Sequence, residues 1–264
     1  MSSFAPASPQ AADLPPRLVV LACAVLQILT PMLPALGVGE PIGSQSESVQ
    51  TLITPAGWAF SIWGALYTGT ILFAIYQALP AQQHSRLLAR LRWPAAGAFL
   101  GNALWAAYTQ VFGLSAISVA IIVFTLVCLL AIFRRLTRWQ PRFTPGERWL
   151  VMLPLTALAG WLTAATIVNI AAALQFHGVE AGSSAPAIAG ALAIVGSVIV
   201  AAALTSARGN PPYALVFLWA LAAIYAAGGQ QSALVAAATA IAALVVIGAM
   251  IAGLRRGGMA KWFH

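Results

Sequence analysis

Eight long apolar segments follow one another along the chain, each about as long as a helix that crosses a lipid bilayer. Such a helix needs about 20 mainly apolar residues. The segments cover residues 17–36, 56–79, 94–112, 116–133, 149–176, 186–206, 211–228 and 232–254. We therefore predict an all-α integral membrane protein with eight transmembrane helices.

The composition excludes a soluble protein. Of the 264 residues, 61% are hydrophobic and only 7% are charged, whereas soluble domains carry about 25% charged residues. The net charge of +8 would favour nucleic acid in a soluble protein, but here the basic residues lie between apolar segments. We expect the lipid bilayer, and no nucleic acid, as a partner. Cys23 and Cys128 both lie in apolar segments, so no disulfide framework is expected.

The distribution of charge predicts how the chain crosses the membrane. If the N-terminus is cytoplasmic and the segments alternate, all 13 basic residues fall in cytoplasmic parts of the chain, whereas Glu40, Glu47 and Glu180 fall outside. Cytoplasmic connections of membrane proteins are enriched in Lys and Arg. We therefore expect both termini in the cytoplasm and the protein in the inner (cytoplasmic) membrane of a bacterium.

The chain divides into four parts. They are a disordered tail (1–16), a five-helix unit (17–176), three additional helices (177–254) and a basic cytoplasmic tail (255–264). Pro94 is expected near the start of the third helix, since proline is tolerated in a first turn. The fifth segment is longer than a bilayer requires, which predicts a tilt, an outward projection or a kink near Pro154. The long outer loop 37–55 is either a lid or a plain connector.

Several kinds of chemistry have no residues to support them. No Asp, Glu, Lys or Arg falls well inside a predicted helix, whereas pumps and proton-coupled transporters rely on buried ionisable groups. His84, His177 and His264 show no spacing typical of metal ligands. We expect no catalytic residues, no metal and no required cofactor, and an enzyme is not the favoured interpretation.

Aromatic and amide side chains recur on three predicted helices, at similar depth. Phe60, Trp63 and Tyr67 share one helical face. The helical rise places Trp63, Trp105 and Asn169 each about 10 Å below the outer surface. This pattern predicts an aromatic-walled cavity with amide donors, suited to a flat apolar ligand. The candidate set is Trp58, Phe60, Trp63, Tyr67, Asn102, Trp105, Trp161, Ala165 and Asn169. Alternatively, Trp58 anchors the chain at the membrane interface and the two asparagines join neighbouring helices.

These residues resemble a known family. The motifs are Pro55–Trp58–Phe60–Trp63–Leu66–Tyr67, Asn102-x2-Trp105 and Trp161-x3-Ala165-Thr166-x2-Asn169. Their order is similar to that of the tryptophan-rich sensory protein/translocator protein (TspO/MBR) family, over residues 17–176. The resemblance implies five helices, a long first loop and a pocket beneath it that binds tetrapyrroles such as porphyrins, or sterol-like molecules. The last three helices have no counterpart in the five-helix members.

The resemblance also implies a regulatory or stress-related role, and porphyrin breakdown in some members. It implies a homodimer through small residues of the third helix, here Gly97 and Gly101; packing within one chain is an equal alternative. We therefore favour a membrane receptor or carrier for a hydrophobic small molecule, with a tetrapyrrole as the bound group. Two alternatives stay open: a small-solute transporter without intramembrane charges, and a structural or assembly subunit of a membrane complex.

Overall fold

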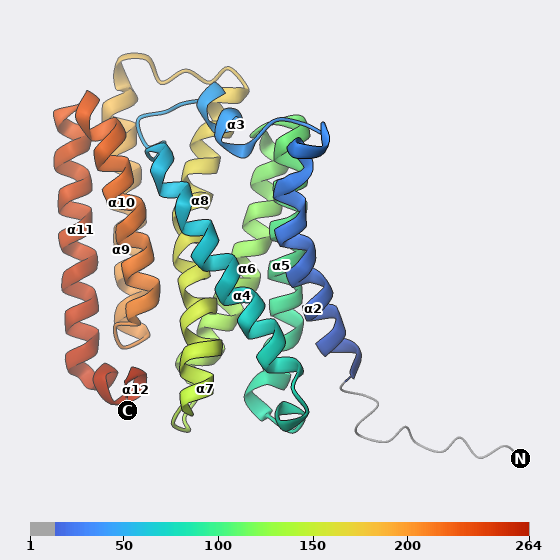
Figure 1. The fold of residues 1–264 in the computed structure, drawn as a ribbon. Helices are drawn as coiled ribbons and strands as arrows, with labels where there is room; N and C mark the ends of the chain where they lie inside the picture. Colours follow the sequence, from blue (N-terminus) through green and yellow to red (C-terminus); the bar gives the residue numbers. More distant parts are fainter. Residues whose placement is uncertain (1–13, 264) are drawn as a thin grey trace, which may run out of the picture.

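The computed structural model describes residues 14–263 as a bundle of long helices (Figure 1). The long helices are α2 (Leu14–Leu29), α4 (Ile62–Ala78), α5 (Arg86–Phe112), α6 (Ala116–Arg138), α8 (Leu153–Phe176), α9 (Ala185–Ser206), α10 (Pro211–Gln231) and α11 (Ala233–Gly253). Short helices are α3 (Ile42–Ser48), α7 (Pro145–Glu147) and α12 (Met259–Trp262). The remaining turns are η1 (Thr30–Leu36), η2 (Gly57–Ser61), η3 (Pro80–Gln82), η4 (Arg148–Met152), η5 (Gly182–Ser184) and η6 (Leu254–Gly258).

The predicted fold class, an all-α membrane protein, is confirmed, with one difference in the helix count. Within residues 14–263, seven helical segments are long and apolar enough to cross a membrane. The third predicted segment, in α5, is not among them. It is 27 residues long, but it begins among arginines and carries Asn102 and Gln110, both fully buried. Neighbouring helices therefore cover the polar groups that lower its hydropathy.

Five helices form a closed ring. Around the ring, α2 packs on α4, α4 on α8, α8 on α6, α6 on α5, and α5 on α2. The other three helices form a second layer, in which α10 packs on α8, α11 packs on α10, and α9 packs mainly on α11 (Figure 1). The five-helix unit and the three-helix unit are thus joined chiefly through α8 and α10.

Segments with basic residues gather at one end of the bundle. The start of α2, the α4–α5, α6–α7 and α9–α10 connections and α12 all lie at the lower end in Figure 1. The α3 loop and the α8–α9 connection, which carry Glu40, Glu47 and Glu180, lie at the upper end. This arrangement agrees with the alternation deduced from the charges; the assignment of the lower end to the cytoplasm stays a prediction.

The third helix begins earlier than predicted. It starts at Arg86, capped by the Ser85 hydroxyl, and Pro94 lies inside it. A proline within a helix leaves the carbonyl four residues earlier without its usual donor. Here that carbonyl belongs to Arg90, and it accepts a hydrogen bond from the Arg135 guanidinium of α6. A neighbouring helix thus supplies the donor that proline removes.

Three other expectations change at the ends of segments. Of the tail predicted to be disordered, residues 1–13 lie outside the described residues, whereas Leu14, Pro15 and Pro16 form the first turn of α2. Near Pro154, where a kink was one of three alternatives expected, a π-helical turn, η4, lies directly before α8. The basic tail folds back under the bundle, because Trp262 is buried with 1% of its surface exposed.

The small-residue face of α5 packs within the chain. A Cβ atom added to Gly97 would lie 2.9 Å from the Cys128 sulfur, and one added to Gly101 would lie 2.3 Å from the Thr125 hydroxyl. Both neighbours belong to α6. In the structure, Gly97 and Gly101 therefore pack against a helix of the same chain, which is one of the two alternatives considered for them. The homodimer through Gly97 and Gly101 that the resemblance implies stays a prediction.

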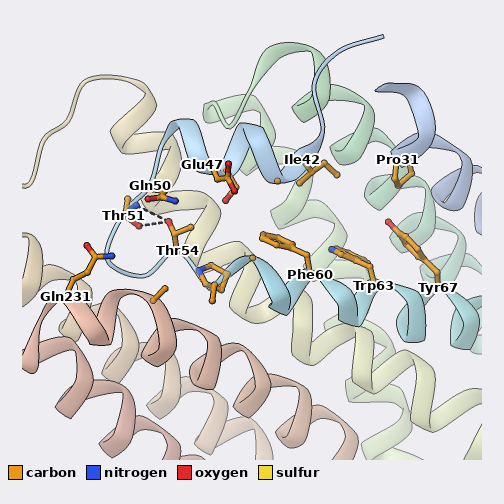
Figure 2. A pocket seen from close by; sticks show the side chains of 16 residues that line it. Pro31, Ile42, Glu47, Gln50, Thr51, Thr54, Phe60, Trp63, Tyr67 and Gln231 are labelled. Carbon is orange, nitrogen blue, oxygen red and sulfur yellow. Dashed lines mark hydrogen bonds between the residues drawn. The ribbon is translucent and has the colours of Figure 1, made fainter. Parts of the chain in front are cut away.

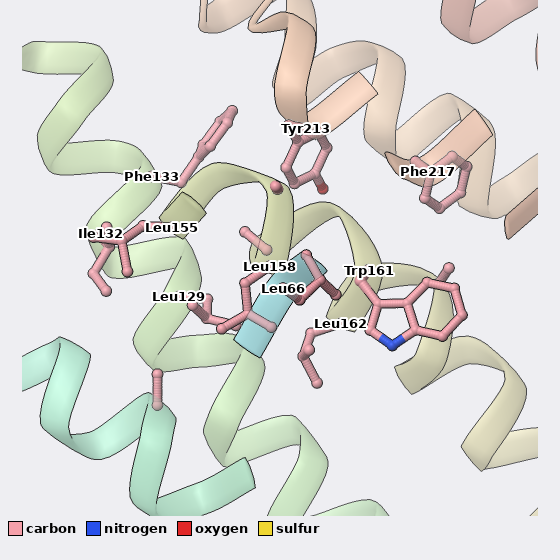
Figure 3. Close-up of a cluster of buried hydrophobic side chains, with 14 of the residues drawn as sticks. Leu66, Leu129, Ile132, Phe133, Leu155, Leu158, Trp161, Leu162, Tyr213 and Phe217 are labelled. Carbon is pink, nitrogen blue, oxygen red and sulfur yellow. The ribbon is translucent and has the colours of Figure 1, made fainter. Parts of the chain in front are cut away.

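The core is centred on α8, the most deeply buried of the long helices. Aliphatic residues of α6 and α8 fill its middle, with Tyr213 and Phe217 of α10 on one side (Figure 3). At Gly160 the backbone of α8 approaches Tyr213 so closely that an added Cβ would lie 2.5 Å from the Tyr213 carbonyl oxygen. Trp161 follows directly, so this tight crossing holds it in position.

Candidate functional site

The long outer loop folds over the open end of the five-helix ring. Gly37 ends η1 in a left-handed conformation, with φ of 80°, which glycine adopts without strain. The loop then reaches α5, where the Glu40 backbone N–H donates to the Gln110 carbonyl at 2.8 Å. The Gln45 amide also donates to that carbonyl at 3.3 Å. These contacts hold α3 across the ring.

The second half of the loop is attached to the three-helix unit. Ile53 is buried, with 2% of its surface exposed, against Ile224 of α10, Val235 of α11 and Ala189 of α9. The Ala56 backbone N–H donates to the Ala223 carbonyl at 3.1 Å. The helices that the five-helix resemblance left unexplained thus anchor the loop that covers the ring.

A cavity of about 420 Å³ lies between α3 and the start of α4. Phe60, Trp63 and Tyr67 form one wall, and their rings rise side by side from η2 and the start of α4 beneath α3 (Figure 2). The Glu47 carboxylate comes from α3 on the opposite side. Polar groups line the end toward the three-helix unit; they are Gln50, Thr51, Thr54 and Gln231.

A smaller cavity of about 50 Å³ lies deeper in the ring. Its walls include four residues of the candidate set: Trp105 of α5 and, from α8, Trp161, Ala165 and Asn169. Residues that line both cavities are Ile42, Ser46, Pro55 and Phe60. The two spaces are therefore adjacent compartments beneath one loop.

Aromatic contacts connect the two compartments. The Trp161 ring meets the Trp63 ring edge to face at a centroid distance of 6.0 Å, and the Phe60 ring in the same way at 6.3 Å. Trp63 in turn stacks on Tyr67 at 5.0 Å. Because aromatic pairs favour these geometries, the rings form a continuous wall from the loop to the interior of the ring.

The smaller cavity is lined by three residues with unpaired hydrogen-bond donors. The indole nitrogens of Trp105 and Trp161 and the amide nitrogen of Asn169 are buried and have no hydrogen-bond partner within the described residues. The other amide atom of Asn169, its oxygen, accepts from the Ser118 hydroxyl at 3.1 Å. Buried donors without partners cost about 1–3 kcal/mol each, so a ligand with acceptor atoms would gain by pairing with them.

Two residues of the candidate set lie outside both cavities. Trp58 is 47% exposed and meets Trp219 of α10 edge to face at a centroid distance of 4.8 Å. Asn102 is fully buried, and its amide donates to Gln27 of α2 at 3.3 Å. Gln27 in turn donates to the Thr70 hydroxyl of α4 at 2.8 Å. Asn102 therefore joins helices, as its alternative interpretation held.

The aromatic and amide pattern does not identify the lining residues outside the three aromatic helices. Pro31, Ile42 and Glu47 come from η1 and α3, whereas Ala220 and Ile224 come from α10. The length of loop 37–55 indicated that this segment could cover a cavity, but it did not indicate which of its side chains face that cavity. Nothing in the apolar pattern of α10 distinguishes Ala220 from its neighbours.

The site has no residues arranged for metal binding. Among residues 14–263, no three His, Cys, Asp or Glu side chains come close enough together to hold a metal ion. The lining groups are aromatic rings, aliphatic side chains, amides, hydroxyls and one carboxylate. Their chemistry suits noncovalent binding of a mostly apolar molecule.

Comparison with known families adds an independent observation. The model of the family described as TSPO-like protein matches residues 17–252. The chain belongs to this family. The match extends beyond the five-helix unit, so the three-helix unit is part of the TSPO-like region rather than an unrelated addition. No curated protein and no solved structure gives a significant match.

Proposed function

We propose that this TSPO-like protein is a membrane receptor or carrier that binds a flat hydrophobic ligand with acceptor atoms, such as a tetrapyrrole, beneath loop 37–55. The observation that carries the proposal is the set of unpaired donors of Trp105, Trp161 and Asn169, which come from residues lining one aromatic-walled cavity. Such a combination of a large apolar wall and a few polar groups is typical of small-molecule sites.

The size of the site supports a ligand larger than the inner compartment. The outer cavity, at about 420 Å³, falls within the range of roughly 300–1,000 Å³ that is usual for ligand pockets. The inner compartment, at about 50 Å³, has room for only a small part of a molecule. We infer that the ligand's ring system lies along Phe60, Trp63 and Tyr67, while one acceptor-bearing edge reaches Trp161.

Binding can be measured by tryptophan fluorescence. Protoporphyrin added to the purified protein in detergent is expected to quench the fluorescence saturably, because Trp63, Trp105 and Trp161 line the site. In a variant with both Trp161→Phe and Asn169→Ala, we expect the dissociation constant to rise about tenfold or more. Two lost hydrogen bonds, at about 0.5–1.5 kcal/mol each, account for a change of this size.

Trp93→Phe provides the matched control. Trp93 is 61% exposed on α5 and lines neither cavity. Its removal should lower the total fluorescence without changing the dissociation constant. Linear quenching without saturation, or equal affinity in the double variant and the wild type, would contradict the proposal.

A further inference from the structure

Another cavity, of about 180 Å³, lies at the opposite end of the bundle from the loop. Three chain segments enclose it. The end of α6 and the connection after it contribute Thr137, Trp139 and Arg142. The α9–α10 turn contributes Arg208, and the folded C-terminal segment contributes Gly257 and Lys261. Figure 1 shows this region beside α12, where the five-helix and three-helix units meet.

Specific contacts hold these three segments together. The Trp262 indole N–H donates to the carbonyls of Ala207 and Arg208, at 3.1 Å each. The Lys261 ammonium donates to the carbonyls of Thr137 and Trp139, at 2.9 and 2.7 Å. The contacts of Lys261 and Trp262 therefore hold together the three segments that enclose the cavity.

The charged groups around the cavity all have the same sign. Arg142, Arg208 and Lys261 line it, and no acidic residue does. The charges of Arg208 and Lys261 are close enough to repel each other. The acid nearest in sequence, Glu147, is engaged in a capping box with Thr144. Within residues 14–263 neither Arg142 nor Arg208 has a side-chain hydrogen bond or an ion pair with an acid.

Two polar atoms of the lining residues are also unpaired. The Thr137 hydroxyl and the Trp139 indole nitrogen are buried and have no hydrogen-bond partner within the described chain. Both can donate a hydrogen bond. An arginine excess at the cytoplasmic side is expected for any membrane protein, but it explains neither the cavity nor these buried donors.

We propose that this cavity is a binding site for a phosphate-bearing anion. The oxygens of a phosphate group can accept from the Arg142 and Arg208 guanidinium groups and from the Thr137 and Trp139 donors. Arginine suits phosphate because its planar donors match two oxygens at once. Two sources share this chemistry: the headgroup of an anionic phospholipid, and a soluble phosphate compound.

Thermal unfolding of the purified full-length protein in detergent tests the site. Inorganic phosphate is expected to raise the melting temperature saturably, compared with chloride at equal ionic strength. The double variant R142Q with R208Q should lose this gain, while R134Q with R138Q should keep it. Arg134 and Arg138 are exposed at the same end of α6 but do not line the cavity, and both variants change the net charge equally.

Trp139→Phe separates a built site from general attraction between charges. It removes one donor without changing the net charge, so the apparent phosphate affinity should fall about tenfold, as for a hydrogen bond to a charged group. An affinity equal to that of the wild type would overturn the proposal. An equal loss in the two arginine double variants would also overturn it.

Nanodiscs distinguish the two sources. If a lipid headgroup is the natural ligand, phosphatidylglycerol should raise the melting temperature above that in phosphatidylcholine, and R142Q with R208Q should abolish the difference. If the ligand is soluble, the two lipids should give equal values, and added phosphate should stabilise the protein in both. The proposal would be overturned if neither the lipid nor phosphate changed the melting temperature in a way that depends on Arg142 and Arg208.

Discussion

Asn102 and Asn169 are both buried amides of the five-helix ring, and their positions relative to the cavities separate their roles. The amide nitrogen of Asn102 donates to Gln27, while its oxygen is buried without a partner within the described residues. Asn102 lines neither cavity, whereas Asn169 lines the smaller one. The amide nitrogen of Asn169 has no partner within the described residues. The spacing of polar residues along the predicted helices assigned both asparagines to the same set of candidate ligand-binding residues. The difference depends on which side chains of α2 and α6 face them, which one sequence does not reveal.

Glu47 offers a test of charge at the mouth of the outer cavity. Its carboxylate lines the cavity, whereas Glu40, on the same loop, does not. A negative charge there opposes the carboxylates of a dicarboxylic porphyrin. We expect Glu47→Gln to lower the dissociation constant about two- to fivefold at low salt, since exposed charge pairs interact by about 0.2–1 kcal/mol.

The control for this prediction is Glu40→Gln, which removes the same charge from the same loop. It should change the affinity far less than Glu47→Gln does. The effect of Glu47→Gln should also fade as salt is raised, because salt screens exposed charges. Equal effects of the two substitutions would mean that the ligand responds to the net charge of the loop and not to the cavity.

At the scale of elements, hydropathy predicts the long helices well because burial in lipid requires apolar side chains over a fixed length. The predicted segment 186–206 differs by one residue from α9. Helix ends beyond the apolar core are harder to predict. α5 continues through Pro94 to Arg86, and Arg135 of another helix satisfies the Arg90 carbonyl that the proline leaves without its donor. Such compensation depends on tertiary contacts.

The crossing of α8 and α10 at Gly160 is the element contact most sensitive to side-chain size. An added Cβ there meets the Tyr213 backbone, which cannot move without shifting α10. About one helical turn further along α8, the Thr163 and Tyr213 hydroxyls form a hydrogen bond of 2.9 Å. We expect Gly160→Ala to lower the free energy of unfolding by about 1–3 kcal/mol, the usual cost of overpacking.

Gly248→Ala is the matched control for this crossing. Gly248 lies inside α11, and a Cβ there would meet nothing within 4 Å. Alanine should therefore leave the stability unchanged or raise it by up to about 1 kcal/mol, through its better helix propensity. Denaturant unfolding in mixed micelles measures both variants. A Gly160→Ala protein as stable as the wild type would show that the crossing is adaptable.

At the scale of the whole molecule, the loop over the cavity connects the two helical units. Its first half is hydrogen-bonded to Gln110 of α5, and its second half is attached to α10 and α11. Trp219 of α10 adds a hydrogen bond of 3.1 Å from its indole nitrogen to the Ala59 carbonyl in η2. The site is therefore built by both helical units, although its motifs come from only three helices. No motif in the last three helices predicted this contribution.

Ile53 is the loop residue through which this attachment can be tested. Ile53→Ala removes a buried side chain from the small cluster with Ile224 and Val235, and such a change costs about 2–5 kcal/mol of local packing. The loop should then open more often, so proteolysis within residues 37–55 should become faster. Porphyrin binding should weaken, because the ligand must also offset the entropy of ordering the loop.

Val38→Ala separates this effect from a general loss of loop side chains. Val38 lies in the same loop and is 46% exposed, so its truncation removes few contacts. We expect protease sensitivity and porphyrin affinity close to those of the wild type. If the loop acts as a lid, saturating porphyrin should slow its cleavage in the wild type and restore part of the protection in Ile53→Ala. Cleavage that does not respond to ligand in either protein would identify the loop as a connector, whose attachment to α10 and α11 serves the fold alone.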